Sequence, residues 1–289
     1  MSTLKISHYL SLVKFSHTVF ALPFAIIGFF LGVEAHGGLP DWSIFVKVVL
    51  CMVFARSAAM GFNRYIDRKF DEQNARTAVR EIPAGTISPN AALAFVITTS
   101  LLFVATSYWI NPLCFVLSPI ALLVVLGYSF TKRFTWLCHI ILGLGLSLAP
   151  IGAYLAVTGE FHILPLYFSF AVLFWTAGFD VIYALQDEDF DRAQQLHSIP
   201  VWLGTKNALN LSSILHAFTS ALLFMAGREG EFGPLYWVGY AIFIVMLVYQ
   251  HSIVKPNDLS RVNLAFGTTN GVASVVFAAF FLIQHFIAQ

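Results

Sequence analysis

Charged side chains are scarce in this sequence. Only 11% of the 289 residues are Asp, Glu, Lys or Arg, whereas 58% are apolar and the mean hydropathy is +0.77. In a soluble globular domain about a quarter of the residues are charged and about half are apolar, so this excess of apolar residues indicates a membrane protein. The formal net charge of +1 lacks the basic excess that nucleic-acid binding requires, and we expect no nucleic-acid partner.

Residues that commonly build disulfides or zinc sites are also few. Cys51, Cys114 and Cys138 lie inside apolar runs without paired spacing, and the nine His residues are scattered. These cysteines are therefore expected to be small buried apolar side chains. Zinc ligands occur at short paired spacings, and calcium loops follow Asp-x-Asp-x-Asp-Gly, a pattern that is absent from the sequence.

Long apolar windows dominate what is present. A spanning helix needs roughly 20 mostly apolar residues. Nine windows qualify, at 16–34, 43–62, 91–109, 112–130, 136–157, 163–186, 207–226, 235–254 and 263–287. The gaps between them are short except 63–90 and 187–206, which hold most of the acidic residues. The sequence predicts an all-α membrane protein, with one polytopic domain over 1–289 and nine transmembrane helices.

The distribution of Lys and Arg predicts the orientation in the membrane. If the N-terminus is cytoplasmic, thirteen of these sixteen residues fall on the cytoplasmic side, and only Arg228 falls on the opposite side. Lys47 and Arg56 lie within the second window. Because cytoplasmic loops carry an excess of Lys and Arg, we expect the N-terminus and both acidic segments inside, and the C-terminus outside.

The two acidic segments resemble each other. Asp67 and Asp187 are 120 residues apart, as are Asp71 and Asp191. Gly-Phe precedes each segment, at 61–62 and 178–179, and Ile-Pro follows each, at 82–83 and 199–200. We interpret this as an internal repeat over about 16–134 and 136–262, followed by a final helix at 263–287. The alternative is chance similarity between two amphipathic helix ends.

Each acidic segment forms a stripe with a four-residue interval. The stripes are Asn63, Asp67 and Asp71, and Tyr183, Asp187 and Asp191. That interval places each set on one face at the end of a helix. A single such stripe also fits a solvated helix face, but two on one side of the membrane favour a shared site. Close carboxylates repel, and Mg2+ commonly bridges carboxylates to substrate phosphates, so the pattern predicts Mg2+ carrying a diphosphate.

Basic residues accompany the stripes. Arg76 and Arg80 follow the first stripe, and Lys132 and Arg133 follow the fourth window. Basic groups beside clustered carboxylates suit a phosphate–metal unit, although Lys132 and Arg133 also fit ordinary anchoring at the cytoplasmic face.

Two further charged residues lie within predicted spans. Arg56 precedes Asn63 by seven residues, and Asp180 precedes Asp187 by seven. Because charge is costly inside the membrane, an intramembrane Arg usually faces a cavity or a partner. Arg56 and Asp180 could each bind a polar substrate group, or they could form an ion pair with each other.

Four segments, taken in order, resemble the UbiA superfamily of intramembrane aromatic prenyltransferases, especially its 4-hydroxybenzoate polyprenyltransferases. They are Ala55-Arg56 leading to Asn63-Arg64-Tyr65-Ile66-Asp67-Arg68-Lys69-Phe70-Asp71; Arg76-Thr77-Ala78-Val79-Arg80 with Pro83-Ala84-Gly85; Tyr128-Ser129-Phe130-Thr131-Lys132-Arg133; and Asp180-Val181-Ile182-Tyr183-Ala184-Leu185-Gln186-Asp187-Glu188-Asp189-Phe190-Asp191. The similarity covers essentially the whole chain. It implies nine helices around a central cavity, in a bacterial cytoplasmic membrane, with the active site facing the cytoplasm.

The resemblance also implies a reaction and its residues. A polyprenyl group would pass from polyprenyl diphosphate to the ring of a hydroxylated aromatic acid, in respiratory quinone biosynthesis. Asn63, Asp67, Asp71, Asp187 and Asp191 would hold two Mg2+ ions, with the four aspartates as catalytic residues, and Arg76, Arg80, Lys132 and Arg133 would bind the diphosphate. Arg56 is our candidate for the acceptor's carboxylate, with Tyr128, Asp180 and Tyr183 as further acceptor-binding candidates.

The acceptor stays open at this stage. We favour 4-hydroxybenzoate. However, Gly-Phe-Asn-Arg at 61–64 departs from the Val-Asn-Asp of many ubiquinone-pathway members. With the segments 17–24 and 196–200, it resembles a menaquinone-pathway branch, so a dihydroxynaphthoate is the alternative.

Two other classes of membrane protein share some of these features. A transporter would explain Arg56, Asp180 and the prolines within spans, but its charged groups would lie at mid-membrane on broken helices. A phosphoalcohol transferase would resemble Asp-Gly-x2-Ala-Arg, and no Asp-Gly occurs near either stripe.

Overall fold

The structure is a computed structural model that describes residues 8–13 and 20–288. Within these ranges the chain is helical, apart from its connections and one isolated β-bridge between Lys255 and Asp258. The helices are α2 (Leu22–Ala35), α3 (Trp42–Gln73), α4 (Pro89–Ile110), α5 (Pro112–Thr131), α6 (Cys138–Thr158), α7 (Ile163–Ala184), α8 (Glu188–Ala193), α9 (Ile199–Glu229), α10 (Pro234–Ile253) and α11 (Asn270–Ala288). A 3₁₀ turn, η2 (Leu185–Asp187), joins α7 to α8, and a π-helical turn, η3 (Leu264–Thr269), precedes α11.

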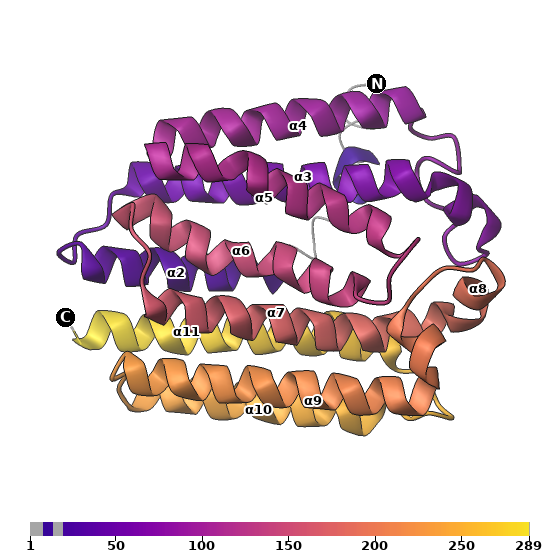
Figure 1. Cartoon of the computed structure of the whole chain (residues 1–289). Coiled ribbons are helices and arrows are strands. Elements are labelled where there is room, and N and C mark those ends of the chain that lie inside the picture. Colours follow the sequence, from indigo (N-terminus) through magenta and orange to yellow (C-terminus); the bar gives the residue numbers. More distant parts are fainter. Residues whose placement is uncertain (1–7, 14–19, 289) are drawn as a thin grey trace.

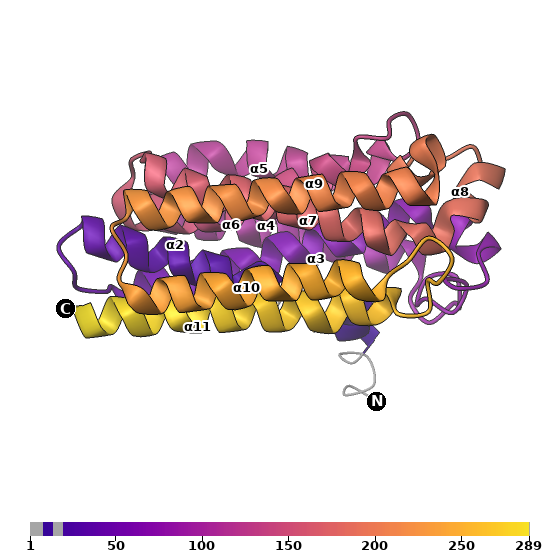
Figure 2. The same ribbon diagram turned by 90° about the horizontal axis from the view of Figure 1, so that it is seen from below.

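The long helices lie side by side in one bundle (Figure 1). Helix α7 packs against α6 and α9, α3 against α4, α2 against α6, and α10 against α11. Both views place α8 and the connection between α3 and α4 at the same end of the bundle, and the C-terminus at the other end (Figures 1 and 2). We call the end that carries α8 the acidic end, because both predicted acidic stripes terminate there.

Local sequence signals explain where several helices begin. The side chains of Asp41, Ser88, Asn111 and Ser198 accept hydrogen bonds from backbone N–H groups in the first turns of α3, α4, α5 and α9. Proline occupies the first or second position of α4, α5 and α9. Helix N-termini prefer such residues. The cap side chains accept hydrogen bonds from N–H groups that have no partner in the helix, and proline has no N–H group.

Helix α2 and helix α7 lie at the centre of the packing. Phe24 of α2 contacts Trp175 of α7 at 5.5 Å between ring centroids, and the indole N–H of Trp175 donates to Asn270 at 3.0 Å. In the most apolar stretch of α7, 72% of the residues are buried, against 11% in α5. A helix that is apolar on every side and has few buried residues, as α5 has, presents part of its surface to lipid.

Glycine allows two of these helices to approach closely. A Cβ on Gly143 of α6 would lie 2.3 Å from the backbone oxygen of Leu173 in α7, which is far inside van der Waals contact. Such small residues let backbones come together where lipid supplies no hydrophobic drive for helix association.

The predicted count of nine spans is only partly matched. Among the described residues, eight helices are long and apolar enough to cross a membrane. Residues 16–19 of the first window lie outside the described ranges, as does the start of the segment 17–24. The described part of that window, α2, has 14 residues, a length of about 21 Å, which is shorter than the hydrocarbon core of about 30 Å.

Helices extend into both predicted acidic gaps. Helix α3 continues beyond its apolar window to Gln73, as the predicted stripe on the helix end requires, and α9 begins at Ile199 rather than at 207. The polar residues that end the apolar windows do not end the helices, because the N-cap at Ser198 and the packing of neighbouring helices determine the boundaries. Gly204 adopts φ 73° within α9, in the left-handed region that favours glycine, and interrupts the helix there.

Candidate functional site

The first acidic stripe lies on one continuous helix. Asn63, Asp67 and Asp71 follow each other at four-residue intervals along the last turns of α3, as the spacing predicts. The side-chain amide of Asn63 donates to Asp67 at 3.0 Å, so the two polar groups share one face of the helix.

The second stripe is not regular, contrary to the expectation of an identical geometry. Tyr183 lies in α7, Asp187 ends the 3₁₀ turn η2, and Asp191 lies in the short helix α8. Glu188 accepts a hydrogen bond from Thr205 of α9 at 2.8 Å, which fixes the start of α8 against the neighbouring helix. A 3₁₀ turn has three residues per turn instead of 3.6, so the side chains after it point in new directions.

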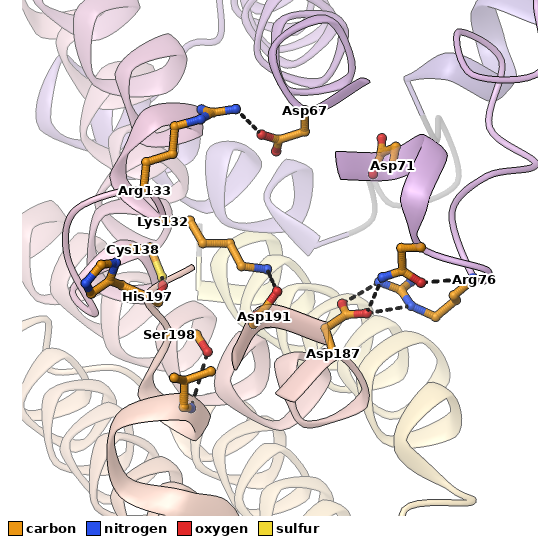
Figure 3. A network of polar contacts seen from close by, with 12 residues as sticks. Asp67, Asp71, Arg76, Lys132, Arg133, Cys138, Asp187, Asp191, His197 and Ser198 are labelled. Atoms are coloured by element: carbon orange, nitrogen blue, oxygen red, sulfur yellow. Dashed lines mark hydrogen bonds and ion pairs between the residues drawn. The ribbon is translucent and has the colours of Figure 1, made fainter. Parts of the chain in front are cut away.

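Each of the four aspartates is paired with a different basic side chain, and Figure 3 shows the pairs of Asp67, Asp187 and Asp191. The pairs are Arg133 with Asp67 (2.7 Å), Arg80 with Asp71 (2.6 Å), Arg76 with Asp187, and Lys132 with Asp191 (2.7 Å). All eight residues are ones that the sequence predicts for the metal and diphosphate site. The structure therefore brings the predicted acidic and basic residues together at the acidic end.

The pairing joins segments that are far apart in the sequence. Lys132 and Arg133, which follow α5, contact Asp191 in α8 and Asp67 in α3 respectively. Arg76, in the connection after α3, contacts Asp187. The connection after α5 thus bridges the two acidic segments, as the close-up in Figure 3 shows.

Burial and charge act in opposite directions on the bases. Burial disfavours the charged form of Lys132, but the carboxylate of Asp191 outweighs this effect and raises the pKa of Lys132. Burial likewise opposes the charge of Arg76, and the hydrogen bonds and negative charge of Asp187 raise the pKa of Arg76. Both bases are therefore charged at neutral pH.

The carboxylates also carry unused acceptor capacity. Asp71 is 6% exposed, and its buried Oδ2 atom has no hydrogen-bond partner among the described residues. Such an atom has the full cost of desolvation without compensation, which is expected of an atom that binds a ligand in another state. Oxygen donors from carboxylates and an amide, as here, suit Mg2+.

A preformed metal cage is absent from the described residues. No three His, Cys, Asp or Glu side chains among them converge closely enough to hold an ion. Each carboxylate faces a base instead, so ion binding at these residues requires the carboxylates to exchange partners.

An apolar cavity of about 390 Å³ adjoins this end of the bundle. Its walls come mainly from α3, α5 and α6, and include Arg56, Met60 and Tyr128. Met60 is three residues before Asn63, and Tyr128 is four before Lys132, so the cavity begins about one helical turn from the charged cluster. It continues along α5 to Cys114, which is fourteen residues away and therefore at a distance of about 21 Å.

The comparisons with known proteins agree with this arrangement. The UbiA prenyltransferase family matches residues 21–284. A 4-hydroxybenzoate octaprenyltransferase of Aliivibrio fischeri (strain MJ11) is 32% identical over 248 residues, which are 85% of each chain. This chain belongs to the UbiA prenyltransferase family. The resemblance inferred from the sequence is thereby confirmed, and the chain is an integral membrane protein.

Solved structures of UbiA homologues share the fold. The apo structure of a homologue from Aeropyrum pernix K1 has a TM-score of 0.83 and 30% identity, and covers 92% of this chain and 97% of that one. A homologue from Archaeoglobus fulgidus bound to GPP and Mg2+ has a TM-score of 0.75 and 25% identity, and covers 96% of this chain and 99% of that one.

The four acceptor-binding candidates separate into two groups in this UbiA family member. Arg56 and Tyr128 line the cavity. Tyr183 instead accepts a hydrogen bond from Arg76 at 3.1 Å, beside the charged cluster. Asp180 does not form the alternative ion pair with Arg56, because its carboxylate binds the ring Nδ1 of His139 at 2.7 Å.

Sequence reasoning missed three residues of the site. His139 also accepts the backbone N–H of Ile199 at 3.3 Å, and in the sequence it is only one of several scattered histidines. Asn74 donates to Asp187 at 3.1 Å. Arg64 is 5% exposed, and its Nε has no hydrogen-bond partner in the described part of the chain. Of these, only Arg64 carried a signal, because a charge between two stripe positions is costly unless it serves the site.

Proposed function

We propose that this UbiA family member is an Mg2+-dependent aromatic prenyltransferase, which moves a polyprenyl group from its diphosphate to 4-hydroxybenzoate. The observation that carries the proposal is the cluster of four aspartate–base pairs, one helical turn from the end of a long apolar cavity. Such a cluster suits a diphosphate with its cations, and the cavity suits the hydrocarbon chain attached to it. Relatives named 4-hydroxybenzoate octaprenyltransferase support the acceptor, and the GPP- and Mg2+-bound homologue supports the cation.

The site residues exchange partners when the donor binds. Asn63, Asp67, Asp71, Asp187 and Asp191 would hold Mg2+, which neutralises charge on the diphosphate when bound. Arg76, Arg80, Lys132 and Arg133, released from the carboxylates, donate to diphosphate oxygens. In the pair of Arg133 and Asp67 both side chains are more than a quarter exposed, so opening it requires only about 0–1 kcal/mol. The buried carboxylates of Asp71 and Asp191 exchange their bases for the bound cation, which keeps their charge compensated.

The cavity supplies the second requirement of the reaction. The bond between the allylic carbon and the diphosphate oxygen breaks, and a carbon–carbon bond forms at the ring position ortho to the acceptor's hydroxyl. The ring proton passes to the leaving diphosphate or to a carboxylate such as Asp187 or Asp191. The apolar walls exclude water, which would otherwise capture the allylic cation.

Two residues of the cavity suit the acceptor. Arg56 can bind the carboxylate of an aromatic acid, since a guanidinium matches the planar geometry of that group. Tyr128 also lines the cavity, four residues before Lys132, so its hydroxyl can contact an acceptor close to the charged cluster. A dihydroxynaphthoate also carries a carboxylate on an electron-rich hydroxylated ring and is the alternative acceptor.

The orientation follows from the positive-inside prediction. We place the acidic end in the bacterial cytoplasm, with the segment 16–34 as the first of nine spans and the C-terminus outside. The test is to label single cysteines in intact cells, using the variants Gly37→Cys and Asn74→Cys in a background without the native cysteines. An impermeant thiol reagent should label the protein through position 37 and not through position 74, and the opposite result would reverse the orientation.

Transport is the rival function. A transporter would move its substrate unchanged, whereas a transferase produces a new compound. Membranes that contain the protein should be incubated with Mg2+, a polyprenyl diphosphate and a panel of phenolic acids, including 4-hydroxybenzoate and a dihydroxynaphthoate. The proposal predicts a prenylated 4-hydroxybenzoate by mass spectrometry, and product from no acid in the panel would contradict it.

A further inference from the structure

A second recess, of about 230 Å³, lies at the acidic end between α9 and the end of α10. Its polar wall consists of Lys206, Asn210 and Ser213 of α9, His251 of α10, and Lys255 just beyond α10. Among the described residues, no acidic side chain lines it. The recess is separate from the aspartate cluster and takes no part in the proposed reaction.

The two lysines differ from the bases of the aspartate cluster. There, each of four basic side chains contacts a carboxylate. Among the ion pairs of the described residues, neither Lys206 nor Lys255 takes part. Asp258 is bonded to Lys255 only through the backbone, and its carboxylate accepts hydrogen bonds from the N–H and hydroxyl of Ser260. Two ammonium groups thus border the recess without neutralisation by any carboxylate that the structure describes.

Hydrogen bonds fix the inner wall. The carbonyl of Trp175 can only accept, so His216 donates to it through Nε2 at 3.2 Å. His216 Nδ1 therefore accepts from His251 Nε2 at 2.8 Å. The remaining nitrogen of His251, Nδ1, lies 3.3 Å from the hydroxyl of Ser213. This chain of bonds orients His251 and Ser213 at the recess and ties them to the buried core of α7.

The surroundings point to the ligand. Farther from the acidic end, the same two helices expose large apolar side chains: Ile214 and Phe218 on α9, and Val248 and Tyr249 on α10. In an integral membrane protein such surfaces meet acyl chains. Lys206 lies two residues after the break at Gly204 in α9, and Lys255 lies just beyond the end of α10. Both are near the acidic end, where long basic side chains reach the level of lipid head groups. A basic pocket between spanning helices, with apolar surface below it, matches the two parts of a lipid molecule.

We infer that this recess binds the phosphate of an anionic phospholipid, with Lys206 and Lys255 pairing with its charge and the side-chain amide of Asn210 donating hydrogen bonds. The acyl chains lie along the exposed faces of α9 and α10. A free phosphate ion shares the head group's chemistry, but it gains nothing from the apolar faces, so the lipid binds more tightly.

Native mass spectrometry of the purified protein in detergent tests the inference, with phosphatidylglycerol, phosphatidylcholine and inorganic phosphate titrated separately. The wild type should retain one phosphatidylglycerol in preference to phosphatidylcholine. The double variant Lys206→Gln/Lys255→Gln should bind phosphatidylglycerol about 30-fold more weakly, since each Lys near an anionic head group contributes roughly a factor of five. Lys206→Arg/Lys255→Arg should keep the affinity, because the charges remain.

Arg228→Gln is the matched control, because it removes an exposed charge at the other end of α9 and should leave the affinity within about twofold. Equal binding of the two lipids, or unchanged affinity of the Gln double variant with a normal melting temperature, would overturn the inference. Binding of inorganic phosphate as tight as that of phosphatidylglycerol would overturn the lipid assignment. Prenyl transfer is not measured, so the result is independent of the proposed function.

Discussion

Arg76 binds both carboxylate oxygens of Asp187 and donates a further hydrogen bond to the hydroxyl of Tyr183. Its Nε lies 3.1 Å from Oδ1, its Nη2 contacts Oδ2, and its Nη1 lies 3.1 Å from the tyrosine oxygen. One guanidinium thus ties the connection after α3 to the end of α7. In this state the base occupies the carboxylate that the proposal assigns to Mg2+, so donor binding has to separate the pair.

Loss of Arg76 should therefore weaken donor binding more than folding. Arg76→Ala removes a diphosphate contact, and we expect the KM for polyprenyl diphosphate to rise at least about tenfold, as for other charge-assisted contacts. Arg76→Lys should recover only part, because an ammonium cannot bind a carboxylate or phosphate in the same bidentate way. Steady-state kinetics with purified protein measures this.

The control for Arg76 is Arg192→Ala. Arg192 also pairs with a carboxylate, Glu188, at 2.9 Å, but its side chain is 57% exposed and it lies outside the four pairs. The KM of this variant for polyprenyl diphosphate should stay within about twofold of the wild-type value, since exposed pairs contribute little. An equal rise in KM for both variants would show that the effect is general loss of positive charge.

The pair of Lys132 and Asp191 should behave as a buried ion pair. The carboxylate of Asp191 is 1% exposed, so Lys132→Met leaves a buried charge without its partner and should destabilise the protein by on the order of 3 kcal/mol. Because the pKa of Lys132 is raised, this contribution is present below the unfolded value of about 10.4 and is lost only as the pH rises through the folded value. Thermal unfolding in detergent at pH 7 measures the loss.

A double variant separates charge from packing at this pair. Lys132→Met/Asp191→Asn removes both charges and should recover at least half of the stability, while remaining inactive. If the double variant is as unstable as the sum of the single variants, the two residues do not stabilise each other.

How much of this site the sequence predicts depends on the range of the interactions. The sequence assigns the eight paired residues to one site. The four-residue spacing of each acidic stripe is a local feature that can be read from the sequence. Which base meets which carboxylate was not predictable, since Arg133 and Asp67 are 66 residues apart. The 3₁₀ turn that ends at Asp187 is followed by a contact between Glu188 and Thr205 of α9, which no spacing reveals.

In the fold, too, local features were predictable from the sequence and contacts between distant segments were not. Hydropathy located the long helices, because each must present apolar side chains to lipid. It misplaced the start of α9, because the apolar window begins at 207 whereas the helix begins at Ile199 and is interrupted at Gly204. The contact between His139 and Asp180 had no sequence signal, because it forms between neighbouring helices α6 and α7.

The cavity should limit the length of the donor chain. Gly152 lines the cavity, and a Cβ there would meet no atom within 4 Å, so Gly152→Phe should place a ring in the empty space. We expect the variant to lose activity with long polyprenyl diphosphates and to keep it with geranyl diphosphate. Product analysis across donors of increasing length measures the shift.

Gly127→Phe is the comparison for Gly152→Phe. A Cβ on Gly127 would also meet no atom within 4 Å, but this residue does not line the cavity. Its donor preference should stay that of the wild type. The same loss of long donors in both variants would show that the cavity does not hold the chain.

The close contact of α6 and α7 should be sensitive to a single methyl group. Gly143→Ala forces a Cβ to within 2.3 Å of the Leu173 oxygen, and overpacking of this kind costs about 1–3 kcal/mol. Gly127→Ala, in the open, should be neutral or stabilising by up to about 1 kcal/mol. Equal melting temperatures of the two variants in detergent would contradict the packing described for α6 and α7.

The central claim is that both acidic segments together bind the metal and the diphosphate for prenyl transfer. The most direct test is the rate of product formation by Asp67→Asn and Asp187→Asn, which change one residue in each segment while keeping its shape. With membrane insertion and melting temperature near those of the wild type, each variant should lose activity by at least about 100-fold, the scale of losing one electrostatic contact in a transition state. Near-normal product formation by either variant would contradict the claim.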